Sequence, residues 1–156
     1  MKIQEVRVLL NSESGLETIL NEYQSSFDII QEIITQLKQD NLSSEKELLS
    51  AQTKLTGLYG SLITVFKIAQ AYKISEESKQ FVHLNEEYEK NNPGSKPLSA
   101  AKLDKLTAIK IANWRTLRNI FEGYVLASEK AIITCQSNLK NLKAERMFSN
   151  TDPERY

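Results

Sequence analysis

The strongest constraint on the fold is a stretch of about fifty residues, 98–148, that contains no proline and one glycine, Gly123. Apolar residues recur through it every three or four positions, and at 100° per residue the row falls within a stripe of about 80°. Leu103, Phe121 and Leu139 are spaced 18 residues apart, which gives the 3.6-residue period of a nearly straight amphipathic helix. The row consists of Leu103, Leu106, Lys110, Trp114, Leu117, Phe121, Tyr124, Ser128, Ile132, Cys135, Leu139 and Leu142.

A helix over 98–148 would be roughly 75 Å long and could not bury its apolar stripe alone. It needs a hairpin partner, another copy of the chain, or both, and we therefore expect a homo-oligomer. Lys110 and Ser128 interrupt the row, and polar residues at such positions often fix helix register or partner number. We interpret the largest apolar members as a core or oligomer seam: Leu103, Leu106, Trp114, Leu117, Phe121, Tyr124, Ile132, Leu139 and Leu142.

Local signals place the other helices. Two capping boxes, Ser14-x-x-Glu17 and Ser44-x-x-Glu47, mark helix starts. Asp40-Asn41 ends the first of these helices, and the loop over 91–97 contains Pro93-Gly94. Residues 2–11 favour a short helix over a strand because Ile3, Val6 and Leu10 lie three and four positions apart.

The predicted fold is therefore all-α: a long helical hairpin with an additional N-terminal helix, forming an elongated three-helix bundle. The sequence predicts helices over about 14–40, 44–90 and 98–148 in a single domain, 1–148, followed by a disordered tail at 149–156.

Composition and residue types argue against an enzyme. The chain has 156 residues, is 40% hydrophobic and contains no apolar run long enough to span a membrane, so we expect a soluble, intracellular, cytoplasmic protein with no membrane partner. Cys135 lies in the apolar row and is expected to be a buried core residue. The only histidine, His83, lies in an acidic segment, and no metal-ligand or nucleophile–base spacing occurs. We expect no cofactor and no metal.

The net charge of zero is unevenly divided. Residues 1–90 carry nine Lys and Arg against fourteen Asp and Glu, a net charge of −5, and residues 91–156 carry eleven against six, a net charge of +5. Acidic and basic helices facing each other, within or between subunits, would explain this division. A basic segment that binds a polyanion would also explain it.

The polyanion hypothesis needs outward-facing bases. Trp114 and Tyr124 could stack on nucleic-acid bases, but both lie in the apolar row, and a core position is the better interpretation. In the competing hypothesis, the bases pair with the acidic segment 76–89. The candidate contacts to a nucleic-acid backbone are Lys105, Arg115, Arg118, Lys130, Lys140 and Lys143.

The C-terminal pattern resembles the last helix of small phage proteins similar to UvsY-type recombination mediators. It runs from Trp114-Arg115 through Phe121-Glu122-Gly123-Tyr124 to residues 136–143, Gln-Ser-Asn-Leu-Lys-Asn-Leu-Lys. The resemblance extends over roughly residues 45–148 and is one of layout. It implies a helical hairpin that assembles into a ring-like oligomer, binds single-stranded DNA and helps to load a recombinase onto strands coated by single-strand-binding protein.

The first functional hypothesis is thus a non-enzymatic, oligomeric, single-stranded DNA-binding accessory protein of phage recombination. Its partners would be other copies of the chain, single-stranded DNA, and a recombinase or single-strand-binding protein. The alternative is a structural or adaptor helical bundle in a larger assembly that binds no nucleic acid. A small regulator that binds a host protein is a third option.

Overall fold

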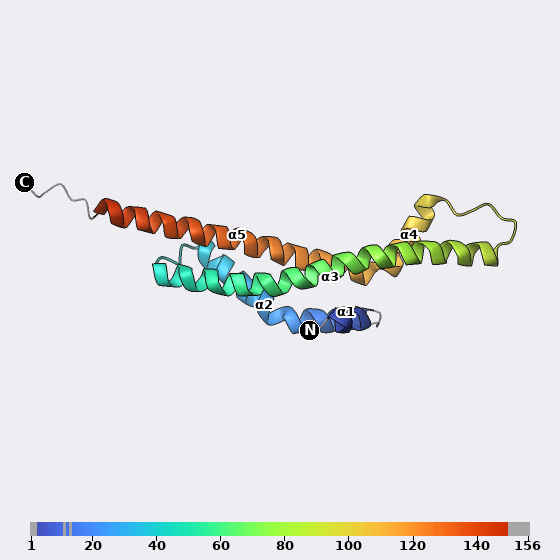
Figure 1. Ribbon diagram of the computed structural model, residues 1–156, viewed down its shortest axis with the longest axis horizontal. Coiled ribbons are helices and arrows are strands. Elements are labelled where there is room, and N and C mark those ends of the chain that lie inside the picture. Colours follow the sequence, from blue (N-terminus) through green and yellow to red (C-terminus); the bar gives the residue numbers. More distant parts are fainter. Residues whose placement is uncertain (1–2, 11, 13, 150–156) are drawn as a thin grey trace, which may run out of the picture. The chain divides into compact units, whose positions relative to one another are not determined.

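The computed structural model describes residues 3–10, 12 and 14–149, and every regular element in this part of the chain is a helix (Figure 1). The all-α prediction is therefore confirmed. The helices predicted over 14–40 and 44–90 are observed as Gly15–Lys38 and Glu45–Asn91, each bound within two residues of the prediction. Ser149 is helical, and the rest of the predicted tail, 150–156, lies outside the described residues. The helices are α1 (Ile3–Leu10), α2 (Gly15–Lys38), α3 (Glu45–Asn91), α4 (Ala100–Lys110) and α5 (Ala112–Ser149).

The chain divides into two compact units. Unit 1 comprises Met1–Glu22 and Thr64–Glu122, and therefore contains α1, the start of α2, the second half of α3, α4 and the start of α5. Unit 2 comprises Tyr23–Ile63 and Gly123–Tyr156, and contains the remaining parts of α2, α3 and α5. Three helices thus contribute to the cores of both units.

Unit 1 is held together by contacts between α3 and α5 and by the packing of α1 on α3. The rings of Tyr72 and Trp114 lie 5.3 Å apart, centroid to centroid, and the Arg7 guanidinium lies 5.5 Å from the centre of the Tyr72 ring. The apolar core of the unit is closed by side chains from every helix that it contains. These are Val6, Leu10, Ile19, Val65, Phe66, Ala69, Leu103, Ile111, Trp114, Leu117 and Phe121.

Unit 2 packs α2, the first half of α3 and most of α5. The Phe27 and Tyr124 rings stack with centroids 4.0 Å apart and planes 16° apart, which joins α2 to α5. Arg146 Nη1 lies 2.6 Å from Glu45 Oε2 and joins the end of α5 to the start of α3. The buried apolar residues are Phe27, Ile30, Ile33, Leu48, Ala51, Leu55, Leu62, Val125, Ala131, Cys135 and Leu139.

The capping box predicted at Ser44 forms in full. The backbone N–H of Glu47 donates to Ser44 Oγ (3.2 Å), and the backbone N–H of Ser44 donates to Glu47 Oε2 (3.0 Å). The Ser44 hydroxyl also donates to this carboxylate oxygen (2.7 Å), and hydrogen bonds from Ser44 lower the pKa of Glu47. This reciprocal pair explains why α3 begins at Glu45.

A turn at Ile111 divides the single helix predicted over 98–148 into α4 and α5. That prediction was wrong in continuity. The buried residues here are Leu103, Thr107 and Ile111, so the row lies one position later than predicted and leaves the Lys110 ammonium in solvent, which avoids the cost of burying an unpaired charge. In the structure Lys110 is exposed and its neighbour Ile111 is buried, with φ −106° and ψ 18°. The buried row resumes at Trp114.

Gly15 determines how closely α2 can approach α1. A Cβ at this position would lie 1.6 Å from the Leu9 carbonyl oxygen, a distance that no side chain can occupy. The Gly15 N–H donates to the Ser12 carbonyl (3.3 Å). The backbone N–H of Ser12 in turn donates to the Leu9 carbonyl (2.8 Å). A glycine at position 15 is therefore a steric requirement of the connection between the two helices.

The buried row supports a direct stability test. Leu117 and Phe121 are 0% exposed, so Leu117→Asp or Phe121→Asp would bury an unpaired carboxylate. We expect each change to lower the free energy of unfolding by about 3–5 kcal/mol, a large part of the stability of a small protein. Urea denaturation, monitored by circular dichroism, measures this loss of free energy.

The matched control is Ile109→Asp, because Ile109 is 72% exposed. This control should lose less than about 1 kcal/mol. Equal losses in the control and the two core variants would mean that the row is not the core of unit 1.

Candidate nucleic-acid interface

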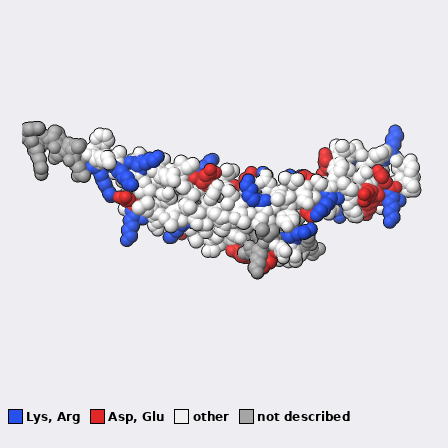
Figure 2. Space-filling view, in the orientation of Figure 1, with Lys and Arg blue, Asp and Glu red and all other residues white. Residues whose placement is uncertain are grey.

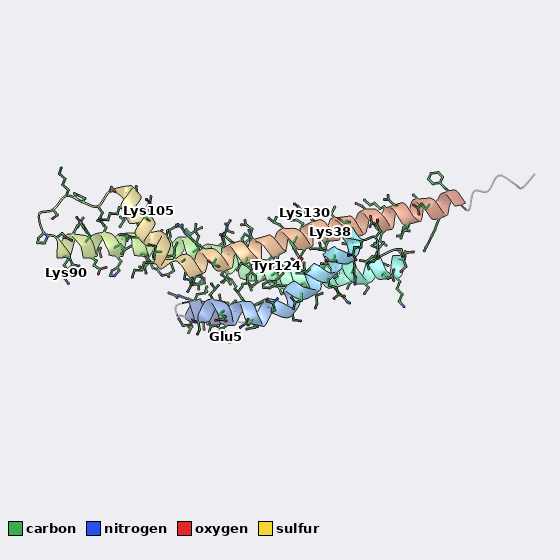
Figure 3. All side chains as sticks on the ribbon, turned by 180° about the vertical axis from the view of Figure 1, so that it is seen from behind. Glu5, Lys38, Lys90, Lys105, Tyr124 and Lys130 are labelled. Carbon is green, nitrogen blue, oxygen red and sulfur yellow. The ribbon has the colours of Figure 1, made fainter. Side chains whose placement is uncertain are left out.

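The six candidate bases occupy different environments. Figure 2 shows that on the face in view Lys and Arg side chains are separated by uncharged residues and by Asp and Glu. Lys105 lies on α4 and Lys130 on α5, and both are exposed (Figure 3). Lys140 and Lys143 are also exposed on α5. None of these four lysines forms an ion pair within the part of the chain that the structure describes.

Arg115 does not point freely outward as the sequence suggested. Its guanidinium is half-buried, and Nη2 donates to Glu77 Oε1 on α3 in a direct ion pair. The other Glu77 oxygen lies 3.2 Å from the Lys73 ammonium. The hydrogen bond from Arg115, followed by that from Lys73, lowers the pKa of Glu77. Arg115 therefore matches the alternative in which bases pair with the acidic segment 76–89.

Arg118 is also engaged within unit 1. Its Nη2 donates to Glu122 Oε1 (2.9 Å), one helical turn away, and its Nη1 donates to Asn119 Oδ1 (3.0 Å). The guanidinium carbon lies 5.8 Å from the centre of the Phe66 ring. These contacts hold the side chain along α5 and neutralise its charge locally. Of the three candidate bases between residues 105 and 118, only Lys105 is exposed and without an ion pair among the described residues.

The seam residues lie inside the units. Leu103, Trp114, Leu117, Phe121 and Leu139 are buried, while Leu106, Tyr124, Ile132 and Leu142 are partly buried. Packing within one chain therefore covers five of the nine fully and the other four in part.

The two aromatic members of the seam pack against other rings of the chain. Trp114 packs on Tyr72, and Tyr124 stacks on Phe27. Their rings are therefore not free platforms for nucleic-acid bases, in agreement with the core interpretation.

Cys135 is buried, as the sequence predicted. Burial raises the pKa of its thiol, so the sulfur stays protonated and is a weak nucleophile near neutral pH. The nearby polar member of the row, Ser128, is also buried and donates its hydroxyl hydrogen to the Tyr124 carbonyl (2.8 Å). Neither side chain offers a reactive group to solvent.

Sequence reasoning missed the individual partner of Arg115. Glu77 lies 38 residues earlier, across the loop that contains Pro93-Gly94. The signal available was the acidic segment 76–89, but the sequence does not specify which of its carboxylates contacts Arg115. The sequence also gave no sign that the Thr107 hydroxyl on α4 is buried and has no hydrogen-bond partner among the described residues.

Comparison with models of known protein families, with curated proteins and with solved structures gives no match. Within the described residues, no helix has both the length and the apolar character required to cross a membrane.

The Glu77–Arg115 pair predicts a pH-dependent contribution to stability. Because the pKa of Glu77 is lowered in the folded chain, folding favours its carboxylate form. The resulting stabilisation is present above the ordinary pKa of 4.5 and is lost as the pH falls through the lowered folded value. Near neutral pH, Glu77→Gln should cost at most about 1 kcal/mol, since the pair is partly solvated.

Urea denaturation of wild type and Glu77→Gln at a series of pH values checks this. The difference between their free energies of unfolding should shrink below pH 4.5. Glu86→Gln, at an exposed position of the same helix, is the matched control and should not change stability at any of these pH values. A constant difference between wild type and Glu77→Gln down to the lowest pH would contradict the assignment.

Proposed function

We propose that this chain is a non-enzymatic helical protein that binds single-stranded DNA through lysines on α5 of unit 2. The observation that carries the proposal is that Lys130, Lys140 and Lys143 are exposed within fourteen residues of one helix. None of the three has an ion-pair partner among the described residues. Lys105 on α4 is a further exposed base in unit 1.

Exposed ammonium groups suit a phosphate backbone, because their binding releases condensed counterions from the nucleic acid. Arg115 and Arg118 already contact Glu77 and Glu122, so a phosphate would have to compete with those carboxylates. We therefore assign the main contacts to the lysines and secondary contacts to the two arginines. Sequence preference should be weak, since backbone contacts carry no base information.

The resemblance to UvsY-type recombination mediators supports a role as an accessory protein of phage recombination in the host cytoplasm. A recombinase or single-strand-binding protein is then the proposed protein partner. The finer layout, an elongated three-helix bundle with a long helical hairpin in a single domain, is part of the same proposal. Small-angle X-ray scattering tests that layout independently of DNA binding.

The DNA proposal predicts that Lys130→Glu, Lys140→Glu and Lys143→Glu together abolish binding of a fluorescein-labelled oligothymidine. Each single Lys→Gln change should reduce the slope of log affinity against log salt by about 0.7, the value for one phosphate contact on a single strand. Fluorescence anisotropy between about 50 mM and about 200 mM NaCl measures both effects.

The charge-matched control is Lys38→Glu, Lys54→Glu and Lys90→Glu, which changes exposed lysines on α2 and α3. This control should retain most of the affinity. If wild type fails to bind at low salt, or if both triple variants lose binding equally, the α5 lysines are not the DNA contacts.

A second candidate function is a structural or adaptor subunit that binds no nucleic acid. It is favoured by Leu126 and Ile133, two large apolar side chains on α5 that are 50% and 55% exposed and lie seven residues apart. Seven residues is close to two helical turns, so both fall on one side of the helix. A second copy of the chain could cover them.

This candidate predicts that the protein is not a monomer of 17.8 kDa in solution. Self-association at Leu126 and Ile133 would remove partly exposed apolar surface from water. Light scattering at micromolar concentration should give a multiple of the chain mass, and Leu126→Asp with Ile133→Asp should reduce it to one chain. A monodisperse monomer for the unmodified protein would exclude this interface.

A further inference from the structure

An exposed stripe on α5 of unit 2 combines apolar and basic side chains. At 100° per residue, six exposed residues between positions 126 and 144 fall within about 80° of one another around the helix. They lie on the side of α5 opposite the buried Cys135 and Leu139. This α5 stripe consists of Leu126, Lys130, Ile133, Ser137, Lys140 and Ala144.

Leu126 and Ile133 are the large apolar members of the α5 stripe. They are 50% and 55% exposed and are separated by about 10 Å along the helix axis. A ligand with apolar groups at a similar spacing would remove this surface from water, which is favourable.

Lys130 and Lys140 are the charged members of the stripe. They lie about 15 Å apart along the axis, and neither forms an ion pair within the part of the chain that the structure describes. None of the six residues of the stripe is Asp or Glu. The charge of the stripe therefore complements an anion, and its occupant must carry anionic and apolar groups side by side.

A single strand of nucleic acid carries both kinds of group. Its phosphates repeat along the backbone, and the flat faces of its unpaired bases are accessible for packing against side chains. In a duplex those faces are stacked between neighbouring base pairs, and only phosphates and base edges remain accessible. Lysines alone bind both forms, because each form carries phosphates. Selection between the two forms must therefore come from the apolar residues.

We propose that the α5 stripe selects single-stranded over double-stranded DNA. Unpaired bases pack against Leu126 and Ile133, while Lys130 and Lys140 contact the flanking phosphates. This inference rests on the proposed DNA-binding function and adds to it the origin of strand selectivity. A second copy of the chain is the competing occupant of Leu126 and Ile133, and it predicts a different response to the probes below.

The test compares three fluorescein-labelled probes of equal length by fluorescence anisotropy. They are oligothymidine, an abasic oligomer with the same number of phosphates, and a duplex. Wild type should bind oligothymidine about fivefold more tightly than the abasic oligomer, because only the former has bases to pack on the stripe. It should also bind oligothymidine more tightly than the duplex, although charge density alone favours the duplex.

The informative variant is Leu126→Ser combined with Ile133→Ser. It should lower the affinity for oligothymidine to that for the abasic oligomer and leave the abasic affinity and the salt dependence unchanged. The matched control is Leu49→Ser combined with Ile74→Ser on α3, where the original side chains are 48% and 56% exposed. This control should bind all three probes as wild type does.

Two outcomes separate this inference from the function on which it rests. If wild type binds oligothymidine and the abasic oligomer equally, the bases do not contact the stripe, and the inference is wrong while the lysine contacts stand. If wild type binds none of the three probes at low salt, the DNA-binding proposal is wrong as well.

Two further outcomes would assign the stripe to another occupant. If the Leu126→Ser, Ile133→Ser variant weakens binding of oligothymidine and the abasic oligomer equally, and light scattering shows that it dissociates, a second copy covers the stripe. Binding to vesicles containing phosphatidylserine, without binding to any DNA probe, would indicate a membrane surface. If the variant does not fold, the three probes on wild type still decide the inference.

Discussion

Burial of one apolar row on α4 and α5 is the interaction on which the rest of the structure depends. Complete burial of a large apolar side chain contributes about 1.5–3 kcal/mol, and Leu117 and Phe121 are both fully buried. Helices in water gain most of their stability from such packing and little from intrinsic propensity. Each unit covers its own part of the row, unit 1 with α1 and α3 and unit 2 with α2 and α3. The exposed lysines of α4 and α5 therefore take their positions from the burial of this row.

The features predicted correctly from the sequence are those with local causes. The Ser44–Glu47 capping box is completed within four residues, so the start of α3 could be predicted closely. Burial of Leu103, Trp114 and Leu139 could be predicted because these apolar residues recur with the 3.6-residue period of an α-helix. The turn at Ile111 could not be predicted in this way. Lys110 fits the helical row by spacing, and only packing against the other helices of unit 1 determines that Ile111 is buried in its place.

The candidate interface was less predictable because it depends on contacts across the chain. Exposure of Lys130 and Lys140 follows from their position outside the apolar stripe. The pairing of Arg115 with Glu77 needs the register of α3 against α5, which a single sequence does not specify to the residue. Even a correct helix assignment would therefore have left Arg115 on the outward face.

The two units present cations in chemically different ways. In unit 1 the Arg115 charge is paired with the Glu77 carboxylate. In unit 2 the lysines of α5 carry charges that no described carboxylate neutralises, so an anionic ligand gains from counterion release. A chain with zero net charge can still bind a polyanion, because affinity depends on local, unpaired charge and not on the total.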